Sequence, residues 1–388
     1  MFPFSNSAMT NVMLPRVVMC IVRERLTSKI YRLDKSLGEK PIDNVGTLQL
    51  FILVIVVYSC RVIVVTGAAG YIGSHVCKEL LDIGHSVIAI DNLSTGKHQF
   101  LDQRALFYKG NIQNRDFLIS TLSKFERGSI KGVIHLAGLK FASESVKNPL
   151  SYYETNSCGT QMILSVMQDF DIQNVVFSSS CSVYGDVFAQ KPVSESENLK
   201  PISPYGKSKL FAESFIQDAV NSLGFRAISL RYFNVAGGTP GVSCDLSRFN
   251  IFPNLFRAAT DELQFDVYGN QYETQDGTCV RDYVDVRLLA NAHIFCLESL
   301  LTGRDLDLVY NLGSGVGNSV YEIIRVVSEV TGIEIKAKLK APRLGDPSQI
   351  LADVTKAKRD LAWNHSISLE EIVESGWNSW KYFRDRIV

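Results

Sequence analysis

Val62-Ile-Val-Val-Thr66, followed by Gly67-Ala-Ala-Gly70-Tyr-Ile-Gly73, is the stretch that decides the fold. The first five residues are all β-branched, which favours a buried strand, and Ser74 to Ile83 have the spacing of an amphipathic helix. A strand, a glycine loop and a helix in this order form a site for a pyrophosphate group. The three glycines permit the tight turn, the close approach of a phosphate and the packing of helix against strand.

The next predicted strand, Ser86–Ile90, ends in Asp91, which follows Gly73 by 18 residues. A carboxylate at this place accepts hydrogen bonds from the ribose hydroxyls of adenosine and repels a 2′-phosphate. No arginine follows directly to bind such a phosphate. The sequence therefore predicts NAD, and not NADP, as the cofactor.

Strands and helices continue to alternate after this unit, which predicts a doubly wound parallel sheet of the Rossmann type with ligands at the carboxyl ends of its strands. The further predicted strands are Leu106–Lys109, Gly132–Leu136, Asn174–Ser178 and Ala227–Arg231. The helices predicted between them are Arg115–Phe125, Leu150–Phe170 and Tyr205–Leu223. A smaller mixed α/β region is expected to follow, with helices Phe249–Ala259, Val320–Thr331 and Leu369–Phe383 and short strands Phe265–Tyr268 and Glu334–Lys338.

Composition narrows the class of protein. The chain has 388 residues, with 40 basic and 40 acidic side chains, so it lacks the basic excess expected of a nucleic-acid-binding protein. Its eight cysteines form no Cys-x-x-Cys pair and no Cys/His cluster, so neither a metal site nor a disulfide framework is predicted. A reducing, cytoplasmic setting is expected.

Residues 1–60 do not match this pattern and are predicted to lie outside the fold. The apolar run Leu48–Tyr58 is too short for a bilayer, which needs about 20 residues, so membrane association is not expected. A cleaved secretory signal is not expected either, because the run lies far from the terminus. Two interpretations stay open: a disordered extension, or a segment that is not native coding sequence. The second would require a non-Met start near Arg61, since no Met occurs between Met19 and Met162.

Ser203-Pro-Tyr-Gly-Lys-Ser-Lys209 carries the candidate chemistry. Tyr205 and Lys209 are four residues apart, so a helix places them on one face, where the lysine charge favours the ionised phenol and lowers its pKa. Ser180 ends the run Ser178-Ser-Ser180 at a predicted strand end, 25 residues before Tyr205, and can bond a substrate hydroxyl. Each feature alone fits a surface pair or a polar turn, whereas their occurrence after the glycine loop indicates a site.

The motifs together resemble the extended short-chain dehydrogenase/reductases and, within them, the epimerases that interconvert UDP-glucose and UDP-galactose. The resemblance runs from Arg61 to about Trp380. The motifs that carry it are Gly67-x-x-Gly70-x-x-Gly73, Asp91-Asn-Leu-Ser94, His135-Leu-Ala-Gly-Leu-Lys140, Ser178-Ser-Ser-x-x-Val-Tyr-Gly185, Ser203-Pro-Tyr-Gly-Lys-Ser-Lys209, Arg231-Tyr-Phe-Asn234, Asp276-Gly-Thr-Cys-Val-Arg-Asp-Tyr-Val-Asp285, Tyr310-Asn-Leu-Gly-Ser-Gly-x-Gly-Asn-Ser-Val320 and Pro342-Arg-x-Gly-Asp346.

The resemblance implies an isomerase that inverts C4 of a UDP-hexose in galactose metabolism, through a 4-keto sugar, with NAD reduced and reoxidised in each turnover. It implies Tyr205, Lys209 and Ser180 as catalytic residues. The other residues implied to bind NAD are Gly67, Gly70, Tyr71, Ile72, Gly73, Asp91, Asn92, Asn111, Ile112, Leu136, Ala137, Gly138, Lys140, Asn156 and Phe233. The residues implied to bind the UDP-sugar, besides Ser180 and Tyr205, are Asn234, Asn250, Tyr268, Arg281, Arg343 and Asp346.

The resemblance also implies a homodimer joined through two long helices. It further implies that two parts of the chain bind different ligands. Residues 61–235 are expected to bind NAD, and residues 236–388 mainly the nucleotide sugar. Trp377 and Trp380 are expected in the core of this second part, since tryptophans there serve packing more often than binding.

Two positions and one segment depart from the usual motifs, the segment being Pro342-Arg-Leu-Gly-Asp346, which is one residue shorter than the common form. Asn111 stands where the family usually has an aspartate that meets the adenine amino group, so a weaker adenine contact is expected. Ile350 falls near a position that holds a bulky tyrosine in some members. A smaller residue there suggests UDP-N-acetylhexosamines as additional substrates.

Three alternative functions share the fold or the cofactor. A nucleotide-sugar 4,6-dehydratase usually has its acid and base directly after the serine, and Cys181 and Ser182 stand there instead, so elimination of water is disfavoured. Another NDP-sugar epimerase is an open alternative. A non-catalytic NAD-binding protein is disfavoured because Ser180, Tyr205 and Lys209 are all present.

Overall fold

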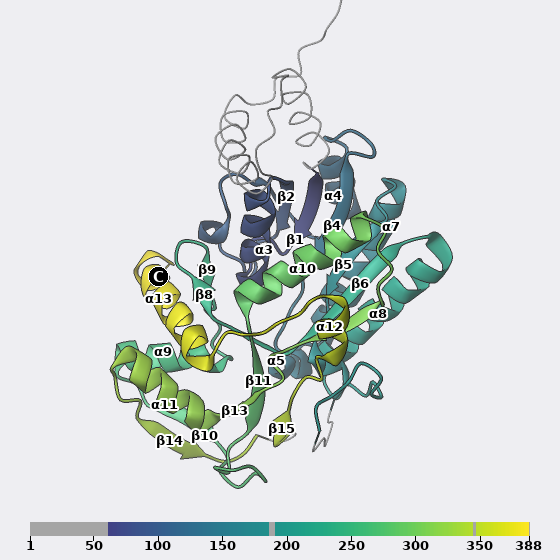
Figure 1. Cartoon of the computed structure of the whole chain (residues 1–388). Helices are drawn as coiled ribbons and strands as arrows, with labels where there is room; N and C mark the ends of the chain where they lie inside the picture. Colours follow the sequence, from purple (N-terminus) through teal and green to yellow (C-terminus); the bar gives the residue numbers. More distant parts are fainter. Residues whose placement is uncertain (1–60, 186–190, 344–346, 388) are drawn as a thin grey trace, which may run out of the picture. The chain divides into compact units, whose positions relative to one another are not determined.

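The protein is represented by a computed structural model that describes residues 61–185, 191–343 and 347–387 (Figure 1). By its internal contacts the chain divides after Cys60, and all described residues belong to the unit that begins at Arg61. The predictions for residues 1–60 and for Asp346 lie outside the described residues. Within the described ranges, no helix is both long and apolar enough to cross a membrane.

A seven-stranded sheet in which every pairing is parallel forms the centre of this unit, which confirms the predicted Rossmann-type fold. The strands lie in the order β12-β6-β5-β4-β1-β2-β3. The order reverses between β1 and β4, and ligands of such sheets bind outside the strand ends at this switch point. The strands are β1 (Val62–Thr66), β2 (Ser86–Asp91), β3 (Leu106–Lys109), β4 (Ile130–His135), β5 (Asn174–Ser178), β6 (Arg226–Tyr232) and β12 (Val309–Leu312).

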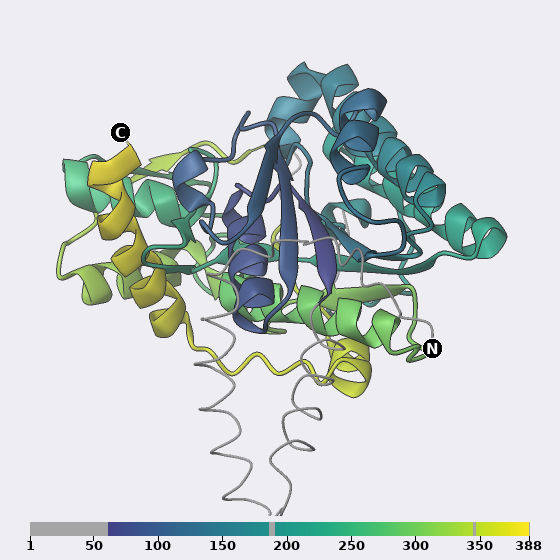
Figure 2. The same cartoon turned by 90° about the horizontal axis from the view of Figure 1, so that it is seen from above.

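Helices cover both faces of the sheet, as Figure 2 shows from above. Ile63 and Val65 of β1 belong to the core beneath α3 and α10, whereas Val64 belongs to the core beneath α4, α7 and α8. Successive residues of a strand point to opposite faces, so an unbroken apolar run is what a sheet covered on both sides requires. The helices are α3 (Tyr71–Asp82) and α10 (Val286–Leu301) on one face, and α4 (Arg115–Leu122), α7 (Gly159–Asp169) and α8 (Pro204–Leu223) on the other.

The remaining elements build the smaller mixed region and its connections. β7, β11, β13 and β15 form one sheet, β10 pairs with β14, and β8 pairs with β9. A separate core joins α9, α11 and α13 and includes Trp377 and Trp380, both less than a tenth exposed, which confirms their predicted packing role. The elements are β7 (Asn234–Ala236), β8 (Gly238–Thr239), β9 (Ser243–Cys244), α9 (Ile251–Asp261), β10 (Phe265–Tyr268), β11 (Val280–Asp285), β13 (Gly317–Ser319), α11 (Val320–Thr331), β14 (Ala337–Lys340), β15 (Gln349–Ile350), α12 (Thr355–Asp360) and α13 (Leu369–Ile387).

Several predicted boundaries were wrong. α3 begins at Tyr71, inside the glycine motif, and not at Ser74. The predicted helix Leu150–Phe170 is divided into α6 (Pro149–Tyr152), a π-helical turn η2 (Tyr153–Cys158) and α7. The predicted strand Glu334–Lys338 lies at Ala337–Lys340. α5 (Ala142–Lys147) and the short 3-10 turns η1 (His98–Phe100) and η3 (Cys181–Val183) complete the described elements.

The chain returns to the large sheet after residue 236. α10 packs on α3 and on β4, β5 and β6, and β12 adds an edge strand beside β6. Neither element was predicted. The large sheet contains strands from both sides of residue 235. The predicted division at that residue therefore concerns only which ligand each part binds, and it stays a prediction.

Candidate active site

A cleft of about 1060 Å³ opens at the carboxyl ends of β1, β2 and β4. It brings together most residues that the sequence assigns to NAD. Those that line it are Gly67, Gly70, Tyr71, Ile72, Gly73, Asp91, Asn92, Ile112, Leu136, Ala137, Gly138, Lys140, Tyr205 and Lys209. The predicted residues that do not line it are Asn111, Asn156, Phe233, Ser180, Asn234, Asn250, Tyr268, Arg281 and Arg343.

The glycine loop packs tightly against the backbone around it. Gly67 has a φ of +70°, and a Cβ built on it would lie 2.7 Å from the Ala137 nitrogen. A Cβ on Gly73 would lie 2.1 Å from the Gly67 oxygen, so neither position accepts a side chain without movement. No side chain caps the start of α3, and its first turn carries no acidic residue. The first amides of α3 therefore suit an anionic group such as a pyrophosphate.

Asp91 is held at the end of β2 by two backbone amides. Its carboxylate accepts hydrogen bonds from the Ala69 nitrogen at 3.0 Å and from the Leu93 nitrogen at 2.7 Å. Burial raises the pKa of Asp91, and these two hydrogen bonds oppose that rise. Carboxylate oxygens have lone pairs beyond those two bonds, so Asp91 can still accept from ribose hydroxyls.

Asn111 does not line the cleft itself, but it is hydrogen-bonded to Asn92, which does. Its Oδ1 accepts a hydrogen bond from Asn92 Nδ2 at 2.6 Å. The carbonyl that would accept from the adenine amino group is therefore shared with Asn92, which supports the expected weakening of that contact.

Tyr205 lies in the first turn of α8. The Ser203 side chain caps this helix by accepting from the Gly206 nitrogen, and Pro204 occupies its first position, where a missing amide costs nothing. Tyr205 is buried, and burial raises the pKa of its phenol, while its hydrogen bond with the Ser180 side chain lowers it. The sequence led us to expect a pKa lowered by Lys209. In the structure the loss of water around the phenol outweighs every lowering effect.

Lys209 follows one turn later and is also buried. Its Nζ donates to the Ser178 oxygen at 2.8 Å and lies 4.9 Å from the centre of the Phe177 ring. A Cβ built on Gly138 would lie 3.4 Å from this nitrogen, so Lys209 reaches the loop after β4. Burial lowers the pKa of Lys209 to about 8, and the charge of Glu213 opposes that fall.

Glu213 was missed by the sequence analysis. Its carboxylate accepts from Arg231 Nε at 2.9 Å and Nη2 at 2.6 Å, and from the Ser179 hydroxyl in a short hydrogen bond. Both charged groups are buried. Ser179 lies between Ser178, which holds Lys209, and Ser180, which bonds Tyr205. Glu213 therefore fixes the serine turn against α8, and its spacing, four residues after Lys209, is the signal that could have revealed it.

Asn156 supports the same helix from the π-helical turn η2. Its Nδ2 donates to the Leu139 oxygen at 3.0 Å and to Ser208 Oγ at 2.9 Å, while its Oδ1 accepts from the Leu139 nitrogen at 2.8 Å. Turns of this kind often occur at functional sites. Although predicted to bind NAD, Asn156 acts in the structure by joining the loop after β4 to α8.

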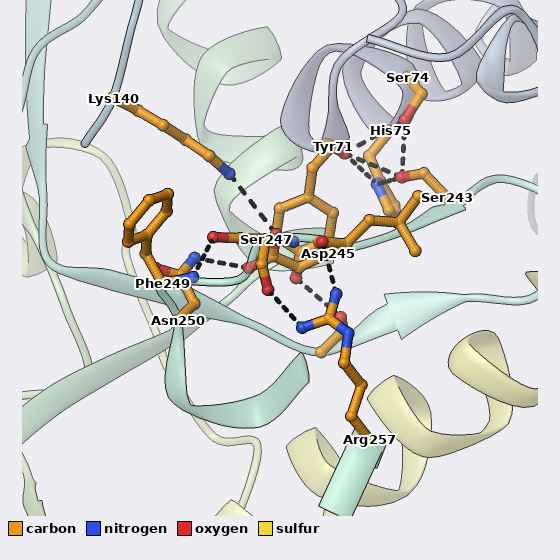
Figure 3. A network of polar contacts seen from close by, with 12 residues as sticks. Tyr71, Ser74, His75, Lys140, Ser243, Asp245, Ser247, Phe249, Asn250 and Arg257 are labelled. Atoms are coloured by element: carbon orange, nitrogen blue, oxygen red, sulfur yellow. Dashed lines mark hydrogen bonds and ion pairs between the residues drawn. The ribbon is translucent and has the colours of Figure 1, made fainter. Parts of the chain in front are cut away.

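A polar network, whose contacts Figure 3 shows, includes several residues that line the cleft. Asp245 lies 3.5 Å from Lys140 Nζ and accepts from Asn250 Nδ2 at 2.5 Å. The Tyr71 hydroxyl donates to the Gly237 oxygen at 2.7 Å. Two residues predicted for different ligands, Lys140 and Asn250, are thus joined by a carboxylate that was not predicted.

The other residues predicted for the substrate lie on the smaller region. Arg343 stacks over the Tyr268 ring, with 3.9 Å between the guanidinium carbon and the ring centre. Arg281 Nη1 donates to the Pro347 oxygen at 2.8 Å, and Asn234 Nδ2 donates to the Asp282 oxygen at 3.2 Å. The structure therefore groups Arg343 with Tyr268 and places Asn234 and Arg281 on paired strands β7 and β11.

Comparison with known proteins assigns this geometry to a family. Residues 63–313 match the NAD dependent epimerase/dehydratase family. The chain belongs to that family. It is 40% identical over 321 residues to the UDP-glucose 4-epimerase of Lacticaseibacillus casei, a match that covers 81% of this chain and 96% of the relative.

Solved structures of epimerases share the fold of this family member. The UDP-glucose 4-epimerase of Brucella ovis in complex with NAD is 35% identical, with a TM-score of 0.78, over 83% of this chain and 98% of that one. The enzyme of Bifidobacterium longum in complex with NAD+ and UDP is 32% identical, with a TM-score of 0.74, over the same shares. The cleft of this epimerase-family chain fits NAD, because its glycine loop, uncapped helix start and the carboxylate of Asp91 lie together at the strand ends.

Proposed function

We propose that this epimerase-family chain interconverts UDP-glucose and UDP-galactose by inverting C4 of the hexose. The observation that carries the proposal is the group of Ser180, Tyr205 and Lys209 beside a cleft built for NAD. The similarity to UDP-glucose 4-epimerases over four fifths of the chain supports the choice of substrate.

Tyr205 is the proposed acid and base at the sugar C4 oxygen. As a phenolate it removes the hydroxyl proton, and as a phenol it returns the proton when the alcohol forms again on the other face. When bound, NAD supplies the acceptor and donor of the hydride. Ser180 bonds the same oxygen, and Lys209 holds a positive charge one helical turn from the phenol, which favours its ionised form.

Burial of the phenol sets a condition on this chemistry. Because burial raises the pKa of Tyr205, the phenolate needs positive charge that enters the cleft with its ligands. Oxidised NAD would supply such a charge when bound, since its nicotinamide is cationic. The hydrogen bond with Ser180 does not outweigh the burial of Tyr205, so we infer that proton removal depends on a loaded cleft.

Inversion requires that the keto sugar present its second face. The sugar ring must then turn, so the binding energy has to come from the UDP portion, which does not react. We propose Asn234, Asn250, Tyr268, Arg281, Arg343 and Asp346 for this role. The Arg343–Tyr268 stack supports it, since it presents a cation beside an aromatic surface.

The test is incubation of the purified chain with UDP-galactose, with separation of the two sugars. Wild type should reach the same mixture from either sugar, and Tyr205→Phe should lose the activity while it keeps NAD binding. A product lighter by one water would assign the chain to the 4,6-dehydratases instead. Activity retained in Tyr205→Phe would remove Tyr205 from the mechanism.

A second group of substrates is favoured by Ile350. It is buried at the end of β15, where it pairs with Arg281 of β11, a residue proposed for the substrate. Isoleucine leaves more room than tyrosine, so we propose UDP-N-acetylhexosamines as additional substrates. Ile350→Tyr should then lose turnover of the acetylated sugars and keep turnover of UDP-galactose. Wild type that never turns over the acetylated sugars would refute this proposal.

We also infer a homodimer. α8 and the short helices before η2 carry large apolar side chains that are exposed, among them Val146, Leu150, Phe211 and Phe215. An exposed apolar patch of this kind marks an association surface. Phe211→Lys should yield a monomer in sedimentation analysis, and a wild-type monomer would contradict the inference.

A reducing, cytoplasmic setting is proposed from the free thiols of all six described cysteines.

A further inference from the structure

Asp245 joins two side chains that belong to different ligands in the proposed function. Its Oδ1 lies 3.5 Å from Lys140 Nζ, which is assigned to NAD. Its Oδ2 accepts from Nδ2 of Asn250, which is assigned to the UDP-sugar. Figure 3 shows the carboxylate between these two groups, on the segment that leads into α9.

Lys140 forms the salt bridge to Asp245, and Arg257 is a second cation close enough to interact with the charge of Asp245. The side chain of Asp245 is 9% exposed, and that of Lys140 is 44% exposed. Arg257 is close by, but its Nη1 donates to the Ser247 oxygen and its Nη2 to the Leu246 oxygen. A nearly buried carboxylate thus borders a cleft whose ligands, NAD and a UDP-sugar, both carry a diphosphate.

We propose that Asp245 opposes the binding of diphosphate groups and links the two halves of the site. A phosphate that binds Lys140 replaces the carboxylate there, and a UDP-sugar that binds Asn250 replaces it as well. Because one carboxylate holds both groups, a ligand that releases it from Lys140 also weakens its hold on Asn250. The ligands in this inference rest on the proposed function, whereas the contacts belong to the structure.

A purely structural role makes a different prediction. Asp245 Oδ1 also accepts from the Ser247 nitrogen at 3.0 Å, which stabilises the turn before α9. An asparagine side chain at this position would keep the acceptor and lose the charge, so Asp245→Asn separates the two roles. If Asp245 only shapes the turn, Asp245→Asn leaves ligand affinity unchanged.

The experiment is calorimetric titration of the full chain with UDP and, separately, with NAD, at low ionic strength. Asp245→Asn should bind both ligands roughly twofold to fivefold more tightly than wild type, as expected for release of a partly exposed ion pair. The gain should shrink at high salt. For NAD, the gain should also change in a Lys140→Met background, because that part of the effect involves the Lys140–Asp245 ion pair.

Asp307→Asn is the matched control. Asp307 forms a more exposed carboxylate–lysine pair with Lys356, at 2.8 Å, outside the residues that line the cleft, so the affinities of Asp307→Asn for UDP and NAD should equal those of wild type. Equal or weaker binding of both ligands by Asp245→Asn overturns the inference. If wild type neither binds UDP nor epimerises UDP-sugars, the proposed function fails, and the NAD titration still decides whether Asp245 opposes a diphosphate.

Discussion

Replacement of Lys209 by methionine should stabilise the fold while it removes the activity. Burial lowers the pKa of Lys209 to about 8, from an ordinary value of 10.5. This difference corresponds to about 3.4 kcal/mol of destabilisation at pH 7, where the buried amine is still charged. Methionine removes that cost but loses the hydrogen bond to the Ser178 oxygen, which is worth about 1.5 kcal/mol. The free energy of unfolding should therefore rise by about 2 kcal/mol.

The sign of the pH dependence follows from the lowered pKa. Between pH 8 and 10.5 the unfolded chain binds a proton at Lys209 that the folded chain does not, so the stability of wild type rises with pH. The advantage of Lys209→Met is complete below about pH 8 and shrinks as the pH rises toward 10.5, where only the loss of the hydrogen bond remains. Urea unfolding of both proteins without added NAD, at pH 7 and at higher pH, measures it.

Lys207→Met is the control, since Lys207 is exposed on the same helix and its replacement should change stability by less than about 0.5 kcal/mol. A Lys209→Met variant that is less stable than wild type at pH 7 would refute the reasoning. It would show that the contacts of the ammonium group stabilise the folded chain by more than the burial of its charge destabilises it.

Three further predictions concern the site. Glu213→Gln should lower the free energy of unfolding by about 3–5 kcal/mol, because it leaves Arg231 buried without a counter-charge, and a loss below about 1 kcal/mol in urea would contradict this. Asn111→Asp should bind NAD about twofold to tenfold more tightly, because a carboxylate can accept hydrogen bonds from Asn92 and from the adenine amino group together. An unchanged affinity in calorimetry would show that Asn111 does not contact the adenine. Ser180→Ala should reduce kcat by at least about tenfold with little change in KM for UDP-galactose, and a change confined to KM would assign Ser180 to binding alone.

Local sequence rules predicted the elements that carry the cofactor. The β-branched run of β1 and its glycines predicted a buried strand and a tight loop, and Ser203 with Pro204 marks the start of α8. These features depend on neighbours in the sequence, so they are visible without a structure. The same holds for Asp91, because its place follows from the end of β2.

Features that depend on distant contacts could not be predicted in this way. α10 packs on the sheet beside α3 and is largely buried, so its apolar residues spread around the helix and give a weak period. Glu213 and Arg231 meet only because β6 packs beneath α8. The raised pKa of Tyr205 has the same origin, since spacing places a lysine nearby but does not reveal burial.

The central claim is that hydride leaves C4 of the sugar and returns to the same carbon. The most direct measurement uses UDP-glucose that carries deuterium at C4, with the UDP-galactose product examined by mass spectrometry and NMR. The account predicts that the deuterium stays at C4 in the product and that Tyr205→Phe forms none of it. Loss of deuterium to water, or its appearance at another carbon, would contradict the account.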